Sequence, residues 1–483
     1  MKRGLDKYKM ENMTSMVSKY LSTVCLVSAL LILAACSQKA SLWEVGENPA
    51  GVYRVMEDYS HYEGDPEKGK EYLFSGNYIG NGIPYDQFIK FFKAEEDTVM
   101  KREGKNKVIP YNFTAFEKEQ GYYVVNGNCF SCHASTINGE VVLGLGNAFS
   151  DYTRNMKARF SLLNWILKRK YGKNSQEWKS YEEQGEFFKI IAPAIVMDNP
   201  GVNPAFRLEE ALVAYRNSKD LRAKKTANFQ LPDIGLGTDV PPLWNLKKKK
   251  VLYYNGVGRG DWSKLLIQAC LLGVNDSSDA RVIQHNFKDA IAWIQTLEPP
   301  AYPYPLDPDM VAKGRNIFGQ NCSKCHGKYE GRETYPNKII PIKEIGTDSL
   351  YAWYALHTPL NEWLNNSWFA TTEPKATGKP SFGYIAPPLD GIWATAPFLH
   401  NGSVPDLESL LNSSARPTYW HRSFEEGQYD MEKVGWAYEA RKSGKGRYTY
   451  DTTLPGFSNQ GHTYGDTLSH QNRQALIAYL KSL

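Results

Sequence analysis

Two stretches of the sequence share the spacing C-x-x-C-H. Their residues are Cys129, Cys132 and His133 in NGNCFSCHAS, and Cys322, Cys325 and His326 in NCSKCHG. Two thiols at this spacing can form thioether bonds to the two vinyl groups of one porphyrin, and the adjacent imidazole can bind its iron. The sequence therefore predicts two covalently attached haem c groups, with the histidine of each motif as proximal iron ligand.

The alternatives for these residue types are a zinc site and a redox-active dithiol. A zinc site needs four ligands close together, whereas the two motifs lie far apart in the chain. A thioredoxin-like dithiol would stand in a βαβ context, and neither motif has one. Cys270, in the apolar stretch WSKLLIQACLLG, is expected to be a buried thiol. Haem attachment is the interpretation we favour.

The amino-terminal residues have the features of an export signal. A basic segment precedes the apolar run YLSTVCLVSALLILAACS, which is short for a membrane-spanning helix and ends in the lipobox-like LAAC. We expect residues 1–35 to be removed and Cys36 to be lipidated. The protein would then be held at the cell envelope by a lipid anchor, facing the periplasm or the cell exterior; a plain secretory signal or a membrane anchor is the alternative.

Composition limits the class of partner. The chain of 483 residues is 42% hydrophobic and 23% charged, as in ordinary globular proteins, and its 13% aromatic share suits large flat cofactors. The formal net charge of +5 includes basic residues of the expected signal, so nothing argues for a nucleic-acid partner. The run KKKK at 247–250 is predicted to be a solvated turn.

A weak internal repeat surrounds the two motifs. Gly121 and Gly314 lie at the same distance before the first cysteine of each motif, and the apolar residues between predict a helix that leads into it. FKDAIAWIQTL at 287–297 and NRQALIAYLKSL at 472–483 predict a closing amphipathic helix for each repeat. Helices cannot continue through EPPAYPYPLDP at 298–308, which we interpret as a linker.

The repeat predicts a mainly α fold with two cytochrome c-like domains, long irregular loops and insertions. The expected segments are an N-terminal extension at 36–105, a first domain at 106–297 with the first haem, the linker 298–308, and a second domain at 309–483 with the second haem.

A further pair of stretches has equal length and the same ends. These are PPLWNLKKKKVLYYNG at 241–256 and PPLDGIWATAPFLHNG at 387–402, and their alignment sets Tyr254 opposite His400. The first domain carries its extra residues before this element and the second domain carries them after it. We therefore expect the two haems to have different surroundings.

The ligand on the distal side of each iron decides what a haem can do. A histidine or methionine there gives a six-coordinate electron carrier, whereas an open position lets oxygen or peroxide bind. For the second haem we expect His462, in the loop PGFSNQGHTYGD before the last helix. His400 and His357 are the alternatives, and each could instead be a surface or packing histidine.

For the first haem the sequence offers few distal ligands. No histidine lies between His133 and His285, and His285 stands in the polar stretch RVIQHNFK. Met197, in APAIVMDNPG, is the plausible sulfur ligand, with a packing role as the other interpretation. We therefore expect a distal side that is open or weakly held, walled by the aromatic-rich insertion 134–240.

The stretch ATAPFLHNGSVPDLESLL at 394–411 resembles the di-haem cytochrome c peroxidase superfamily and, more closely, its branch of rubber-oxygenase-like di-haem cytochromes. The resemblance in motif order covers most of the chain beyond about residue 110. It implies a mostly helical fold, an N-terminal haem that faces oxygen or peroxide, and a second haem bound by His326 and His462. It places His400 near the interface between the haems, as a tentative catalytic residue. The lipobox departs from the freely secreted rubber oxygenases, so we do not expect polyisoprene cleavage.

Together these features predict an exported di-haem c-type cytochrome and oxidoreductase. Its first haem would react with peroxide or O2, and its second haem would relay electrons. The expected partners are an electron donor or acceptor protein of the cell envelope and a small oxidant. One alternative is a lipoprotein that only transfers electrons, and another is a structural lipoprotein with vestigial haems.

Overall fold

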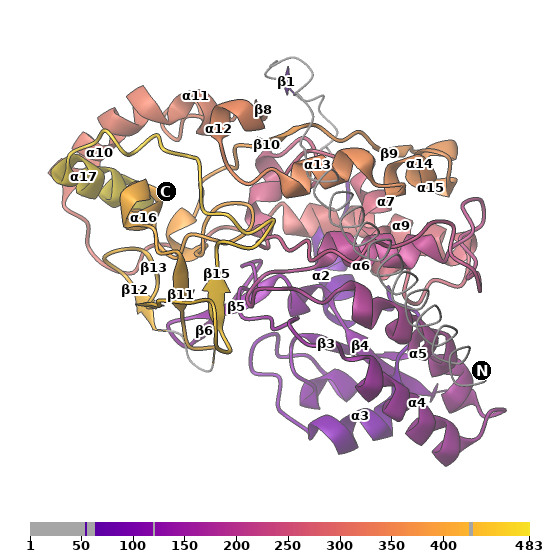
Figure 1. The fold of residues 1–483 in the computed structure, drawn as a ribbon. Coiled ribbons are helices and arrows are strands. Elements are labelled where there is room, and N and C mark those ends of the chain that lie inside the picture. The colour runs from indigo at the N-terminus through magenta and orange to yellow at the C-terminus, as the bar shows by residue number, and fades with distance from the viewer. Residues whose placement is uncertain (1–53, 56–62, 119–120, 425–427) are drawn as a thin grey trace, which may run out of the picture. The chain divides into compact units, whose positions relative to one another are not determined.

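The computed structural model describes residues 54–55, 63–118, 121–424 and 428–483 (Figure 1). These residues belong to one structural unit, Ala50–Leu483. The expected signal at 1–35 and the lipidation site Cys36 lie outside the described residues. None of the described helices has the length and hydrophobicity of a membrane span.

One pair of crossing helices joins the amino-terminal part to the stretch before the proline-rich segment. Helix α2 (Pro66–Ser75) packs on α9 (Ser277–Ile294). The Asp65 carboxylate caps α2, and its backbone N–H donates to Asp289 Oδ1 at 2.8 Å. A Cβ on Gly69 would lie 1.9 Å from the carbonyl oxygen of Asp289, so the two backbones meet at this glycine.

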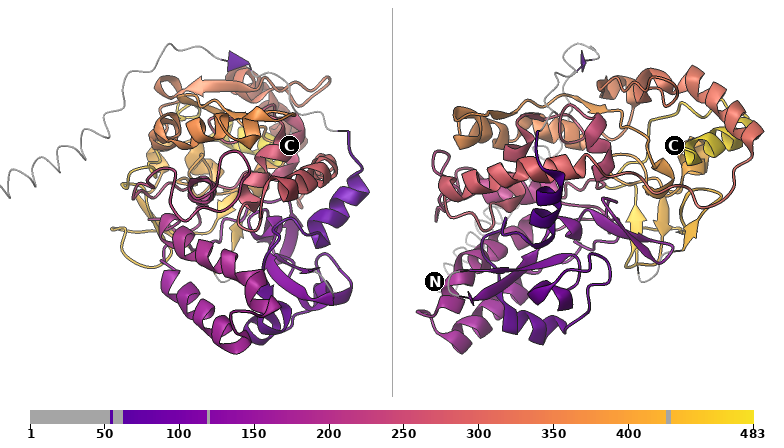
Figure 2. Two further views of the ribbon diagram at one scale, coloured as in Figure 1. Left: turned by 90° about the vertical axis from the view of Figure 1, so that its right-hand side faces the viewer. Right: turned by 180° about the vertical axis from the view of Figure 1, so that it is seen from behind.

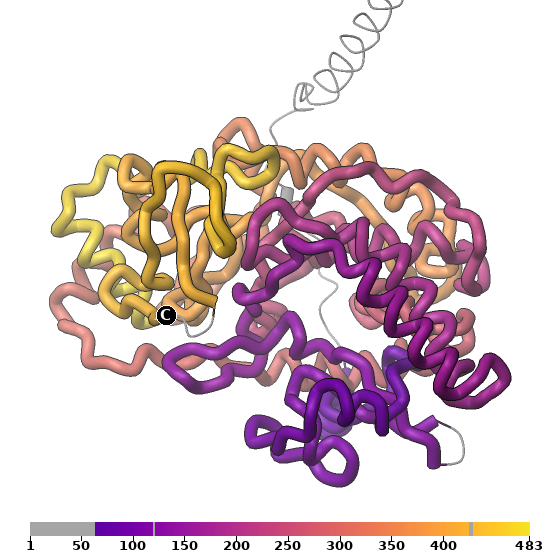
Figure 3. Tube along the Cα trace, turned by 60° about the horizontal axis from the view of Figure 1, so that its bottom comes forward, coloured from indigo at the N-terminus to yellow at the C-terminus, as the bar shows by residue number. Residues whose placement is uncertain are grey.

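A second pair repeats this arrangement at the other end of the chain. Helix α10 (Pro308–Asn321), capped by Asp307, packs on the final helix α17 (His470–Lys481). A Cβ on Gly314 would lie 1.9 Å from the carbonyl oxygen of Ala475. Figure 2 shows both pairs from two further sides, and in the tube of Figure 3 the yellow C-terminal segment returns beside the salmon-coloured α10. Helix α10 ends where the second C-x-x-C-H motif begins.

Among the described residues, twelve further α-helices and five short 3₁₀ helices connect these pairs and cover them. The longer ones are α3 (Tyr85–Phe92), α4 (Lys157–Tyr171), α5 (Gln176–Ala194), α6 (Ala205–Ala214), α13 (Leu350–His357) and α14 (Leu360–Asn365). The α-helices of four residues are α7 (Trp262–Leu265), α8 (Ile267–Cys270), α11 (Ser323–His326), α12 (Ile342–Ile345), α15 (Trp368–Thr371) and α16 (Leu407–Leu410). The 3₁₀ helices are η1 (Gly104–Val108), η3 (Cys129–Ser131), η4 (Leu243–Lys248), η5 (Ile392–Ala394) and η6 (Ser413–Ala415).

Small antiparallel sheets make the fold mixed α/β, so the prediction of a mainly α fold is wrong. The described chain is 40% helical and 13% strand. The three-stranded sheets have the orders β2 (Ile83–Pro84)–β4 (Tyr123–Gly127)–β3 (Phe113–Glu117), β1 (Arg54–Val55)–β8 (Lys338–Pro341)–β10 (Gly383–Ile385) and β14 (Glu439–Ala440)–β11 (Tyr419–His421)–β15 (Thr449–Asp451). The two-stranded sheets pair β5 (Ala134–Ile137) with β6 (Glu140–Leu143), β7 (Gly258–Gly260) with β9 (Ala376–Gly378), and β12 (Tyr429–Asp430) with β13 (Gly435–Trp436).

The segment before the first motif shows why the helix prediction failed. Residues 123–127 form the central strand β4, in which Val124 and Val125 are buried. Val125 pairs with Ala115 on one side and with Ile83 on the other. Two adjacent β-branched residues fit a strand buried on both faces, and the apolar count alone did not distinguish that strand from a helix.

The closing helices were predicted correctly. They appear as α9 and α17, and no helix or strand interrupts the proline-rich stretch from 298 to 307. The domain boundaries at 105, 297 and 308 stay a prediction.

The α10–α17 crossing can be tested with two glycines of the same helix. Gly314→Ala should lower the free energy of unfolding by about 3 kcal/mol, because the new methyl group meets the backbone of α17. Gly319→Ala should raise it by about 1 kcal/mol, because nothing lies within 4 Å of the added Cβ. Urea unfolding of both variants checks this; equal effects would contradict the close crossing.

Candidate haem centres

The two C-x-x-C-H motifs have the same backbone turn. The N–H of His133 donates to the Cys129 carbonyl at 2.9 Å, and that of His326 donates to the Cys322 carbonyl at 3.0 Å. The second cysteine of each motif also donates to the first, at 3.3 Å and 3.1 Å. Each motif is thus one helical turn, which holds two thiols and one imidazole close together.

At the second motif, the imidazole of His326 is oriented by a backbone carbonyl. Its Nδ1 lies 2.8 Å from the carbonyl oxygen of Pro387, the first proline of the PPL element. A carbonyl can only accept, so Nδ1 carries the proton and Nε2 is left as the nitrogen that could bind a metal.

His462 faces His326, as expected for the distal ligand. The ring centroids are 6.2 Å apart and the ring planes are inclined by 69°. One iron bound to both imidazoles would hold the centroids about 6 Å apart, given metal–nitrogen bonds of about 2 Å. The spacing of the two rings therefore fits an iron between them.

The space around these rings is apolar and large enough for a porphyrin. Both thiols of the second motif, His326 and His462 line one cavity with an empty volume of about 700 Å³. Eight of the residues that line it are leucines or isoleucines: Leu389, Ile392, Leu407, Leu410, Leu411, Leu468, Leu476 and Leu480. The residues present fit a covalently attached, bis-histidine haem.

Burial sets the charge of both imidazoles. It lowers the pKa of His462 to about 3 and also lowers the pKa of His326, where the Pro387 carbonyl opposes the effect. Both rings are therefore neutral at neutral pH, which is the form that binds a metal.

Arg416 holds the loop that carries His462. Its guanidinium donates to the carbonyls of Asn459 at 2.6 Å, Gly461 at 2.7 Å and His462 at 3.2 Å. Two further N–H groups donate to the carbonyls of Ser409 and Leu410. One planar group thus ties the His462 loop to the end of α16.

Two backbone features complete this loop. The backbone N–H of His462 donates to the Ile345 carbonyl at 2.7 Å. Gly461 has φ +75°, and a Cβ there would lie 2.2 Å from the backbone of Gly346. The close approach requires glycine and leaves His462 little freedom to move away from His326.

The first motif is supported from the amino-terminal side. Asn128 caps the turn by accepting from the Phe130 N–H at 3.0 Å, and its amide donates to Thr114 Oγ1 and the Tyr111 carbonyl. The Phe130 ring packs edge-on against Phe74 of α2, with centroids 5.6 Å apart. The first motif therefore depends on residues of the expected N-terminal extension.

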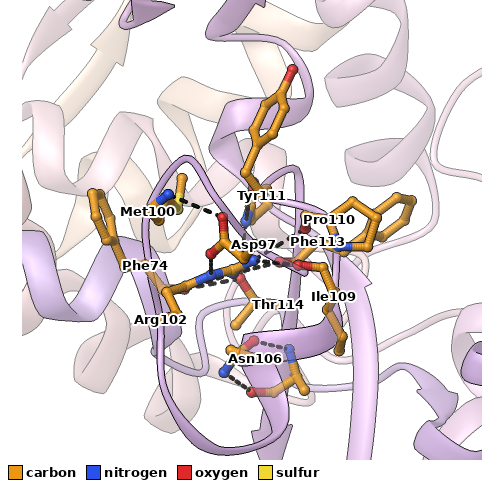
Figure 4. A network of polar contacts seen from close by, with 12 residues as sticks. Phe74, Asp97, Met100, Arg102, Asn106, Ile109, Pro110, Tyr111, Phe113 and Thr114 are labelled. Atoms are coloured by element: carbon orange, nitrogen blue, oxygen red, sulfur yellow. Dashed lines mark hydrogen bonds and ion pairs between the residues drawn. The ribbon is translucent and has the colours of Figure 1, made fainter. Parts of the chain in front are cut away.

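A buried ion pair fixes this support (Figure 4). Arg102 Nε lies 2.6 Å from Asp97 Oδ2, and both side chains are almost fully buried. The same guanidinium donates to four backbone carbonyls, those of Phe74, Ile109, Pro110 and Phe113. It thereby connects the end of α2 to strand β3, which carries Thr114.

The imidazole of His133 is held less firmly than that of His326. Its Nδ1 is buried and makes no hydrogen bond with the described residues. Burial lowers the pKa of His133 to about 4, and the nearby carbonyl of Pro241 opposes this shift. Pro241 and Pro387 occupy the same position in the two PPL elements. The repeat thus places one proline carbonyl beside each proximal histidine.

No histidine in the described part of the chain is brought to His133. Among the described residues, no histidine ring is in contact with its imidazole. His285 is exposed on α9. Met197 packs with Trp420, Tyr450 and Phe457 in a cluster that also includes Tyr152, whose side chain hydrogen-bonds with the Cys132 thiol. His357, an alternative for the second haem, is exposed and stacks on Trp353.

His400 lies in a larger cavity that extends from the second site. The cavity has an empty volume of about 1100 Å³ and is also lined by His326 and His462. His400 stacks on Tyr384 with ring centroids 4.1 Å apart and meets the Tyr254 ring edge-on at 6.3 Å between centroids. Burial lowers the His400 pKa to about 3, and its Nε2 is buried without a partner.

The sequence reasoning missed two buried carboxylates on α6. Burial raises the pKa of Glu209 to about 8, and the Tyr253 hydroxyl donates to it at 2.6 Å. Glu210 is paired with Arg207 and accepts from the Tyr354 hydroxyl. The sequence feature that could have revealed them is a pair of adjacent glutamates in the largely apolar stretch NPAFRLEEALVA. Cys270 links this group to the first motif, because it interacts with both Glu209 and Cys129.

Comparison with known proteins agrees with the class that this geometry defines, a cytochrome c-like domain with covalent haem c. Residues 383–421 match the family model described as RoxA-like, cytochrome c-like. This segment includes Pro387, which orients His326, and His400. The match supports a relation to the RoxA-like cytochromes c.

Two proteins of Sinorhizobium fredii are similar over parts of the chain. The uncharacterized protein y4iM is 27% identical over 278 residues, covering 51% of this chain and 62% of its own length. The uncharacterized protein y4iJ is 30% identical over 254 residues, covering 39% of this chain and 41% of its own length. The chain thus spans less than two thirds of either relative.

Arg416→Lys tests whether the guanidinium positions His462. Lysine keeps the charge but cannot donate to five carbonyls, so the loop should loosen and the low-spin fraction of the second haem should fall. The free energy of unfolding should also drop by about 2 kcal/mol. Visible spectra at full haem content measure the first effect, and urea unfolding measures the second.

Arg441→Lys is the matched control, because Arg441 is an exposed guanidinium that pairs with Glu439. It should leave the spectrum and the stability unchanged. If Arg416→Lys were destabilised but kept a fully low-spin second haem, Arg416 would not position His462.

Proposed function

We propose that this protein is an exported di-haem c-type cytochrome that acts as an oxidoreductase. Its first haem centre, at Cys129, Cys132 and His133, reacts with peroxide or O2. Its second centre is a bis-histidine site that relays electrons. The proposal rests on a difference between the two proximal histidines. The ring centroids of His326 and His462 lie 6.2 Å apart, whereas His133 faces no histidine among the described residues.

The second centre has the features of an electron relay. The neutral imidazoles of His326 and His462 would both hold the iron of a haem bound there, and apolar side chains line the cavity. Arg416 and Gly461 restrain the loop that carries His462. A haem held by two histidines would supply electron transfer without binding a substrate, because both protein ligands would stay on the iron.

The first centre has the features of a reactive site. A haem held there would supply an iron with a sixth position available to a small oxidant. Glu209 holds a proton at neutral pH, because burial raises its pKa to about 8. The Tyr253 hydroxyl fixes the orientation of that carboxyl group at 2.6 Å. A buried, protonated carboxyl group near the motif can donate a proton to O2 or peroxide as that molecule is reduced.

His400 is proposed as a residue between the two centres. It lines the cavity that reaches His326 and His462, and Tyr254 and Tyr384 hold its ring. Its buried Nε2 has no partner, so it is available to a group that enters this cavity. We propose it as a catalytic residue.

The cellular setting of the proposal follows from the amino-terminal sequence. The LAAC stretch ending at Cys36 favours a lipid anchor at the cell envelope. An anchored oxidoreductase needs an electron donor or acceptor there, and a protein of the envelope is the proposed partner.

Carbon monoxide binding tests the difference between the two centres. The reduced protein should bind one CO for every two haems, because only the first iron has a free position. His462→Ala should raise the ratio to two, whereas His357→Ala, which removes an exposed histidine, should leave it at one. Titration followed in the visible spectrum gives the ratio.

A reduced protein that bound no CO and had two six-coordinate, low-spin haems would contradict the reactive first centre. It would favour a lipoprotein that only transfers electrons.

A further inference from the structure

The run of four lysines at 247–250 is not a solvated turn. Lys247 pairs with Glu298 at 2.6 Å, and Lys248 pairs with Glu333 at 2.9 Å and with Asp390 at 2.6 Å. Lys249 differs from both, because its side chain is buried, with 8% of the residue exposed. The two ion pairs of Lys248 show that this segment packs against the second half of the chain.

Lys249 lines the larger cavity, which also contains Cys325, His326 and His462. It is the one lysine or arginine among the residues that line this cavity in the described part of the chain. The two acidic residues of the lining are Asp239 and Asp390, and Asp390 is already paired with Lys248. The larger cavity thus has a single long basic side chain, whereas Lys324 of the second motif lines the smaller cavity that holds both thiols.

The ammonium group of Lys249 has no partner in the described protein. No hydrogen bond or ion pair of its Nζ occurs there, and burial alone lowers its pKa to about 8, with no carboxylate opposing the shift. A buried, unpaired ammonium is costly, so such a group is expected to meet an anion. At pH 7 the group still carries its charge.

The backbone on both sides of Lys249 is clamped by one side chain. The Asn337 amide donates to the Lys248 carbonyl at 3.0 Å, and its oxygen accepts from the Lys250 N–H at 2.9 Å. Asn337 directly precedes β8 and is itself buried. The backbone position of Lys249 is therefore set by the segment that follows the second motif.

We propose that Lys249 is the counter-ion of a propionate carboxylate of the haem attached at Cys322 and Cys325. A haem carries two carboxylates, and a carboxylate that enters a buried cavity needs a cation or hydrogen-bond donors. Lys249 is the cation that this cavity offers. The inference rests on the di-haem assignment of the proposed function, but not on the oxidant chemistry of the first centre.

The consequence is electrostatic coupling between the two halves of the chain. Lys249 belongs to the PPL element of the first repeat, whereas the haem belongs to the second. A positive charge near the haem edge stabilises the reduced iron, because reduction removes one positive charge from the centre. Lys249 therefore raises the reduction potential of the second haem.

Lys249→Met in the full-length, haem-loaded protein tests this role. At pH 7 and a fixed solution potential near the wild-type midpoint, the ratio of reduced to oxidised second haem should fall about tenfold. The His326–His462 low-spin signal identifies that haem, and the first haem should change much less. Lys249→Arg should restore most of the ratio.

Lys247→Met is the matched control, because it removes the same charge from the same run at a lysine that pairs with Glu298, whose side chain is 73% exposed. It should leave the ratio unchanged. An equal fall in both variants would show a general charge effect and overturn the proposal, as would no change in Lys249→Met.

A structure of the wild-type holoprotein supplies a readout that needs no variant. Lys249 Nζ should lie within about 4 Å of a propionate oxygen, and an ammonium that points to another group would overturn the proposal. Haem content by mass spectrometry separates the two claims: a chain without haem at Cys322 and Cys325 refutes the di-haem assignment itself.

Discussion

The facing pair of buried imidazoles, His326 and His462, is the constraint on which the second half of the structure depends. Two neutral rings must stay about 6 Å apart across an apolar cavity, although nothing in the protein bonds one to the other. The carbonyl of Pro387 orients one ring, and the loop fixed by Arg416 and Gly461 presents the other. The α10–α17 crossing at Gly314 supports the motif that carries His326. These parts come from four separate stretches of the chain.

The first half repeats this plan with one difference. Helices α2 and α9 cross at Gly69 as α10 and α17 cross at Gly314, and Pro241 lies beside His133 as Pro387 lies beside His326. What is missing among the described residues is a loop that presents a second imidazole. The first half instead has Glu209 on α6, a buried carboxyl group whose pKa burial raises to about 8. The proposed division between a reactive centre and a relay follows from this difference.

Much of the candidate site could be predicted because its signals are local. The short patterns are the C-x-x-C-H spacing, the PPL repeat and the glycine-rich loop around His462. They indicate haem attachment, equivalent elements in the two halves and a candidate distal histidine, respectively. The fold was harder. Val124 and Val125 form a strand that an apolar count could not distinguish from a helix, and α2 was missed because its ten residues gain their stability from packing on α9. Lys249 could not have been found at all, because charge runs are usually solvated and its burial is set by the distant Asn337.

The central claim is that the two irons have different ligand sets, and electron paramagnetic resonance of the oxidised protein tests it most directly. The account predicts two signals of equal weight: one low-spin signal from the bis-histidine second haem, and one high-spin signal from the first haem. Two low-spin signals would contradict it, because the first iron would then already have a strong distal ligand.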